Sequence, residues 1–236
     1  MKPIAVFRHS PGEGPGYFAT FLERQGIPWE LIAIDAAVSP PPTPEAYSGL
    51  CFMGGPMSVN DDLPWIPRVL ELIRSADRLG IPVIGHCLGG QLMAKAFGGT
   101  VSRNPVKEIG WGTVTKVASD TANEWMGDVD AFLSFHWHGE TFTIPDGANR
   151  IMTSPWCGNQ AFVRGPHLAL QCHVEMTPTM IESWCRIGAE EIAAVRAQPS
   201  VQEAAAMKAN LDERIRDLRI VADTLYSRWL RGLRSE

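Results

Sequence analysis

The first hundred residues alternate between short apolar runs and longer amphipathic segments, and this alternation constrains the fold more than any other feature. The apolar runs lie at 2–9, 29–35, 50–55 and 81–85. The segments with apolar residues at helical spacing lie at 17–26, 64–80 and 88–99. Strands that alternate with helices form βαβ units. We therefore expect an α/β fold with a mainly parallel open sheet and helices on both faces.

The middle of the chain holds closely spaced strand candidates, and the last third has a helical pattern. The strand candidates lie at 110–117, 130–142, 150–155, 160–165 and 167–175. Their short connections predict a small antiparallel section of the sheet. We expect residues 1–190 to form one domain and residues 191–236 to form a helical C-terminal extension packed on it.

Composition argues against several classes of protein. The chain has 236 residues and a formal net charge of −5, whereas nucleic-acid binding requires concentrated Lys and Arg. No apolar run approaches the roughly 20 residues of a membrane span, and the N-terminus lacks the apolar segment of a secretory signal. We therefore expect a cytoplasmic protein with no nucleic-acid or membrane partner. Its five cysteines form no CxxC pair, which favours free thiols over a disulfide framework.

The stretch GHCLGGQ, residues 85–91, places a cysteine between a predicted strand and a predicted helix. This is the cysteine form of the nucleophile elbow, a sharp turn that lifts one side chain clear of the sheet. Glycines permit the crowded backbone, and the free N–H groups of the helix favour the thiolate of Cys87. The N–H of Leu88 is then placed to stabilise an oxyanion. On this turn alone, the alternative is that Cys87 is a small buried residue.

A nucleophilic cysteine needs a histidine to move its proton and a carboxylate to orient that histidine. His173 and Glu175 end the apolar segment 167–175, and residues i and i+2 of an extended segment share a face. His86 adjoins Cys87, but consecutive strand residues point to opposite faces, so we expect a poor base. A chance surface pair is the alternative for His173 and Glu175.

With Cys87, His173 and Glu175 in this order, the chain resembles the class I glutamine amidotransferases. It is most similar to the stand-alone members that resemble the glutaminase domain of GMP synthase. The resemblance covers roughly residues 1–190. It is carried by FMGGPMSVNDD (52–62), GHCLGGQLMAKAFGG (85–99), HWHGETF (136–142) and QCHVEMT (171–177).

The resemblance implies a flavodoxin-like class I glutaminase fold and a defined chemistry. Cys87 would attack the γ-amide carbon of glutamine and release ammonia, leaving a γ-glutamyl thioester that water hydrolyses. His173 would be the general base and acid, and Glu175 would orient it. The resemblance also implies an oxyanion hole formed by the N–H groups of Gly55 and Leu88. The substrate-binding residues that it implies are Gly54, Gln91, Trp137, Gly139 and Glu140.

Two features depart from the pattern of many relatives. Cys172 and Val174 replace an aromatic residue and a proline around His173; we expect Val174 to face away from the cleft. His136 and His138 share a strand face, as metal ligands do, but no third ligand is evident from the sequence. We therefore expect no metal and no cofactor, and hydrogen bonding of both histidines within the pocket loop.

Several functions remain open at this point. The sequence contains neither an SGGxDS loop nor a G-x-x-x-x-G-K-[ST] loop, so we do not expect this chain alone to make GMP. It could supply ammonia to a separate synthetase, hydrolyse glutamine alone, or act as a γ-glutamyl peptidase on glutathione-like compounds. A non-catalytic regulatory protein that kept the fold is a further alternative, because fold does not imply activity. The parallel βαβ beginning argues against a papain-like peptidase.

Overall fold

The computed structural model describes residues 1–233, so the last three residues of the predicted C-terminal extension lie outside the described residues. The strands are β1 (Ile4–Arg8), β2 (Trp29–Ala33), β3 (Gly49–Phe52), β4 (Val83–His86), β5 (Val101–Lys116), β6 (Ala131–Phe142), β7 (Asn149–Thr153), β8 (Ala161–Arg164) and β9 (His167–Leu170). In the described part of the chain they form one sheet in the order β2-β1-β3-β4-β9-β8-β7-β5-β6.

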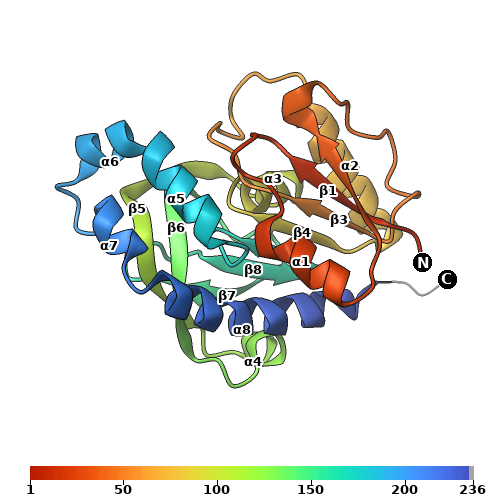
Figure 1. Cartoon of the computed structure of the whole chain (residues 1–236). Coiled ribbons are helices and arrows are strands. Elements are labelled where there is room, and N and C mark those ends of the chain that lie inside the picture. Colours follow the sequence, from red (N-terminus) through yellow and green to blue (C-terminus); the bar gives the residue numbers. More distant parts are fainter. Residues whose placement is uncertain (234–236) are drawn as a thin grey trace.

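The helices lie on both faces of this sheet (Figure 1). They are α1 (Gly16–Arg24), α2 (Ile66–Leu79), α3 (Leu88–Ala96), α4 (Asp120–Met126), α5 (Pro178–Ile187), α6 (Ala189–Val195), α7 (Ala204–Lys208) and α8 (Leu211–Leu230), with a short 3₁₀ turn, η1 (Ile34–Ala36). None of the described helices is long and apolar enough to cross a membrane.

The sheet is mixed, which confirms the predicted α/β class. From β2 to β9 the neighbouring strands are parallel, and from β9 to β6 they are antiparallel. The antiparallel section is larger than expected, because β5 begins at Val101 and pairs with β6 along most of its length. A register shift between Arg103 and Glu108 interrupts the alternation there, and this irregularity hides the first half of β5 in the sequence.

Two hydrophobic cores cover the two faces of the sheet. In β1, Ile4 and Val6 belong to one core and Ala5 and Phe7 to the other. A strand buried on both faces has no polar side, which is why the first apolar runs show no alternation. The helices α2 and α3 cover one face, and α1 and α8 cover the other.

The C-terminal helix α8 packs against α1, α4 and β6, and it runs beside α1 in Figure 1. Its residues Tyr226 and Trp229 are fully buried. This face of the sheet therefore depends on the end of the chain. The division of the chain into two parts at residue 190 stays a prediction.

Candidate active site

Cys87 lies in a sharp turn between β4 and α3. Its φ of 50° falls in the left-handed region, where a residue other than glycine is strained. A Cβ at Gly89 would overlap the carbonyl oxygen of Phe52, and one at Gly90 would overlap that of Leu170. The glycines therefore let α3 start directly against the neighbouring strands, and the strained turn leaves Cys87 at the N-terminal end of the helix.

His173 and Glu175 form a buried pair just beyond the end of β9. His173 Nδ1 lies 2.6 Å from Glu175 Oε1, and each residue is 1% exposed. The backbone N–H of His173 donates to the Phe135 carbonyl at 2.8 Å, and the Trp184 ring meets the imidazole edge-on at 4.9 Å between centroids. Strand β6 and helix α5 thus fix the histidine from two sides.

The electrostatics of the pair involve Cys87. Burial alone would lower the pKa of His173, but the Glu175 carboxylate and the Cys87 thiol raise it well above its ordinary value. Burial opposes ionisation of Glu175 in the same way, yet His173 and His86 lower the pKa of this carboxyl. The three groups that the sequence singled out therefore lie close enough to interact.

Cys87 is the cysteine that lines a cavity of about 730 Å³ among the described residues. The sequence-predicted residues that share this cavity are Gly55, Gln91, Trp137, Gly139 and Glu140. Gly54 and Leu88 do not line it. A Cβ at Gly54 would lie 3.4 Å from His173 Cε1, and one at Gly55 would lie 2.8 Å from Leu88 Cδ2. The glycine turn after β3 thus lies beside both the histidine and the residue after the cysteine.

The other cysteines have different surroundings. Cys51 is fully buried, with its Sγ 4.0 Å from His86 Nδ1, and burial raises the pKa of this thiol well above its ordinary value. Burial also raises the pKa of Cys172 to about 12. Both thiols are held neutral in the core, as is typical of inert cysteines. Val174 is also buried in the core, away from the cavity.

Gln171 contacts the nucleophile candidate and was missed by the sequence reasoning. Its Nε2 donates to Cys87 Sγ at 3.5 Å, and its Oε1 accepts from Gln91 Nε2 at 3.1 Å. Gln91 Nε2 also donates to the Glu140 carbonyl at 3.5 Å. The sequence feature that could have indicated Gln171 is its position directly after the apolar strand β9.

Glu13, in the loop between β1 and α1, was also missed. Its carboxyl lines the same cavity and lies against Gly54. Burial raises the pKa of Glu13 to about 7, while nearby His173 opposes the rise. The loop is held by Trp184, whose Nε1 donates to the Gly12 carbonyl at 2.8 Å. The glycine-rich loop therefore places a carboxyl group at the cavity, and the pKa of this group is near neutral.

His86 is fully buried and is not among the residues that line the cavity. Its Nε2 is 3.0 Å from Tyr226 Oη of α8 and 4.0 Å from Glu175 Oε2. Burial lowers the pKa of this histidine. His86 thus lies between Glu175 and the C-terminal helix.

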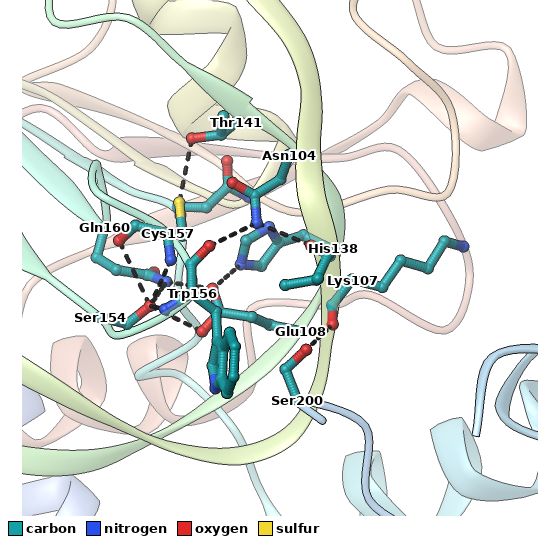
Figure 2. Close-up of polar contacts among 12 residues, drawn as sticks. Asn104, Lys107, Glu108, His138, Thr141, Ser154, Trp156, Cys157, Gln160 and Ser200 are labelled. Atoms are coloured by element: carbon teal, nitrogen blue, oxygen red, sulfur yellow. Dashed lines mark hydrogen bonds and ion pairs between the residues drawn. The ribbon is translucent and has the colours of Figure 1, made fainter. Parts of the chain in front are cut away.

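His136 and His138 are joined by Glu108, the third group that the sequence did not reveal. Potential ligand atoms of the three residues all lie within 4.8 Å of one another, and all three side chains are buried. Figure 2 shows Glu108 and His138 among Ser154, Gln160 and Cys157. Glu108 lies in the irregular part of β5, where no regular spacing marks a residue as inward-facing.

The comparison with protein families agrees with this geometry. The model of the family "Glutamine amidotransferase class-I" matches residues 21–184. The chain belongs to the class I glutamine amidotransferase family. This match confirms the resemblance drawn from the four motifs. The matched region includes Cys87, His173 and Glu175.

Three named proteins match more than half of the chain. A solved glutamine amidotransferase from Methylobacillus flagellatus is 45% identical, with a TM-score of 0.97 over 100% of this chain and 97% of that one. A glutamine-hydrolyzing GMP synthase subunit from Methanospirillum hungatei is 32% identical over 62% of this chain and 76% of its own length. Gamma-glutamyl peptidase 3 of Arabidopsis thaliana is 27% identical over 68% of this chain and 69% of its own length.

Proposed function

We propose that this protein is a glutaminase-type hydrolase that releases ammonia from the γ-amide of glutamine. The observation that carries the proposal is the buried His173–Glu175 pair, 2.6 Å apart, next to a cysteine that lines a cavity. A thiol, an imidazole and a carboxylate in this order are what acyl transfer through a covalent intermediate requires.

In the proposed mechanism, His173 takes the thiol proton of Cys87 and the thiolate attacks the amide carbon. The tetrahedral intermediate carries its charge on the former carbonyl oxygen. The intermediate collapses when His173 transfers this proton to the amide nitrogen. Ammonia then leaves, and a γ-glutamyl thioester remains. Water then attacks the thioester, His173 takes its proton, and glutamate leaves as the thiol re-forms. His173 Nε2 has no hydrogen-bond partner among the described residues and is available for these transfers.

Glu175 and the backbone supply the electrostatic support. The carboxylate holds Nδ1 of His173 protonated and stabilises the imidazolium that forms in each half-reaction. The N–H groups of Leu88 and Gly55 are the proposed oxyanion donors, because Leu88 begins α3 and the Gly55 turn lies against its side chain. Gly54, Gln91, Trp137, Gly139 and Glu140 remain the proposed residues for binding the rest of the substrate.

Cys87, rather than Cys51, is the proposed nucleophile. Cys51 also lies near a histidine, with 4.0 Å between its Sγ and His86 Nδ1. It is fully buried, however, and the raised pKa keeps its thiol neutral. A substrate has no path to a thiol in the core, whereas Cys87 lines the cavity.

A γ-glutamyl peptidase is the second candidate, because acylation of Cys87 is the same for any γ-glutamyl compound. The cavity of about 730 Å³ is in the range of general small-molecule sites, and one relative is named a gamma-glutamyl peptidase. The partner depends on this choice: similarity to one component of a GMP synthase favours a separate ammonia-accepting synthetase. The free thiols support a cytoplasmic location.

The test measures ammonia and glutamate release from glutamine, and amine release from γ-glutamyl peptides, by wild type, Cys87→Ala and Cys51→Ala. We expect Cys87→Ala to lose about 10³-fold or more of the activity and Cys51→Ala to keep it. The substrate with the highest kcat/KM decides between the two candidates. Equal activity of Cys87→Ala and wild type would contradict the mechanism. Loss of activity only in Cys51→Ala would identify Cys51 as the nucleophile instead.

A further inference from the structure

His138 lies between two acceptor oxygens. Its Nε2 lies 3.0 Å from Glu108 Oε2, and its Nδ1 lies 3.0 Å from the Glu140 carbonyl oxygen. A backbone carbonyl only accepts, so Nδ1 must carry a proton and donate it. At Nε2 the contact with the Glu108 carboxylate is close but lacks the geometry of a hydrogen bond. The N–H at Nδ1 is therefore directed at the Glu140 carbonyl oxygen.

Glu108 is fixed in place by donors of its own. Its Oε1 accepts from Ser154 Oγ at 2.8 Å, and its Oε2 accepts from Gln160 Nε2 at 2.7 Å. The backbone N–H of Cys157 donates to Ser154 Oγ at 3.0 Å. Figure 2 shows Ser154 and Gln160 beside the Glu108 carboxylate. Glu108 is 2% exposed, and this network fixes the carboxylate beside His138.

The fixed carbonyl of Glu140 sets the orientation of the Gln91 amide. Gln91 Nε2 donates to the Glu140 carbonyl at 3.5 Å and to Gln171 Oε1 at 3.1 Å. Both of its N–H groups are thereby used, so the atom left for a ligand is Oε1, an acceptor. Gln171 in turn donates to Cys87 Sγ at 3.5 Å. A continuous chain of contacts thus runs from Glu108 to the cavity and to the sulfur.

We propose that Glu108 and His138 are positioning residues that act through the Glu140 carbonyl to orient Gln91 Oε1 as an acceptor for the α-ammonium group of a γ-glutamyl substrate. The proposal rests on the function proposed above. It accounts for a buried His–Glu pair that the reaction itself does not use. It also assigns the pair to the amino-acid end of the substrate, separate from the proton transfers that His173 and Glu175 carry out.

A metal ion is the competing explanation for this cluster, because His136 completes a group of three potential ligands. His136 is 1% exposed, and neither ring nitrogen has a hydrogen-bond partner among the described residues. Glu108, however, already accepts from Ser154 and Gln160 and contacts His138 directly. An ion would have to displace contacts that are already made. A metal site would require His136 as a ligand, whereas the positioning of Gln91 by Glu108 and His138 does not involve it.

The experiment compares His138→Phe with His136→Phe, two substitutions of the same kind on the same face of β6. Each variant is assayed with glutamine and with glutaramic acid, which is glutamine without its α-amino group. We expect His138→Phe to lower kcat/KM for glutamine about tenfold, chiefly through KM, the loss that one misdirected hydrogen bond brings. With glutaramic acid the loss should be less than twofold. His136→Phe should change neither value more than twofold.

Glu108→Gln keeps the size of the side chain and replaces His138→Phe in the experiment if that variant fails to fold. Its kcat/KM should fall for glutamine but not for glutaramic acid, and by less than in His138→Phe. Equal losses for both substrates would overturn the proposal, since a structural defect affects both alike. Stoichiometric zinc in the purified wild type that both histidine variants lose would overturn it in favour of a metal site. If the wild type releases ammonia from neither substrate, the proposed function fails first, and this inference with it.

Discussion

At the scale of the residue, the surroundings of each cysteine decide what it can do. Cys87 has a φ of 50° and precedes the first residue of α3, so it lies at the end of the helix where backbone N–H groups have no partner within the helix. Cys51 and Cys172 lie in the core, where burial raises their pKa values. The local backbone, and not the residue type, therefore distinguishes the proposed nucleophile.

The pair His173 and Glu175 gives a prediction at this scale. Glu175→Gln keeps an acceptor for His173 Nδ1 but removes the charge that raises the pKa of His173. We expect a loss of about 10²-fold in kcat for ammonia release, against a larger loss for His173→Ala, which removes the proton carrier. The measurement is kcat for both variants at one pH, with folding checked by circular dichroism. A greater loss in Glu175→Gln than in His173→Ala would contradict the assigned roles.

At the scale of the element, helix α8 is part of the support of the site. Tyr226 Oη lies 3.0 Å from His86 Nε2, and His86 Nε2 lies 4.0 Å from Glu175 Oε2. The residue that precedes the proposed nucleophile is thus held by the last helix of the chain. This gives His86 a structural setting that its position in GHCLGGQ does not reveal.

Two tyrosines at the α8 interface offer a matched comparison. Tyr226→Phe leaves His86 Nε2 without its partner in a fully buried site, and an unsatisfied buried polar group costs about 1–3 kcal/mol. Tyr17 Oη donates to Asp223 Oδ1 at 2.7 Å, near the surface. Water can replace that contact, so Tyr17→Phe should cost less than about 1 kcal/mol. Urea unfolding of both variants tests this order, and an equal or reversed order would contradict it.

At the scale of the whole molecule, several ionisable groups are buried in the neutral form. Burial lowers the pKa values of His9, His136 and His167 from 6.5 to about 4. The unfolded chain therefore binds three protons below pH 6.5 that the folded protein accepts only near pH 4. Glu13 has the opposite sign: its pKa is raised from 4.5 to about 7, so its stabilisation is present below pH 4.5 and lost as the pH rises to 7.

Three histidines outweigh one carboxyl group, so we expect the free energy of unfolding to fall as the pH is lowered from 6.5 to 4. Each histidine contributes about 2 kcal/mol of the loss by pH 5. Urea unfolding at pH 7 and pH 5 measures the sum. In His136→Phe the loss should shrink by about 2 kcal/mol, the contribution of this one histidine. A free energy of unfolding that is flat between these two pH values would contradict the prediction.

The sequence by itself determined what depends on short spacing along the chain. The βαβ alternation predicted the class of fold, and the glycines around Cys87 and the His-x-Glu spacing marked residues that the structure brings together. These patterns are local, because strand, turn and helix geometry fix the positions of residues a few places apart. The family match confirms the resemblance that they support.

The tertiary structure alone decided the contacts between distant segments. Glu108 meets His138 through the register of β5 on β6, across an irregularity that hides the pattern. Gln171 reaches Cys87 through the pairing of β9 with β4, and Tyr226 reaches His86 because α8 returns to the sheet. Such contacts depend on the register and packing of elements that are far apart in the chain. No spacing within one segment encodes them.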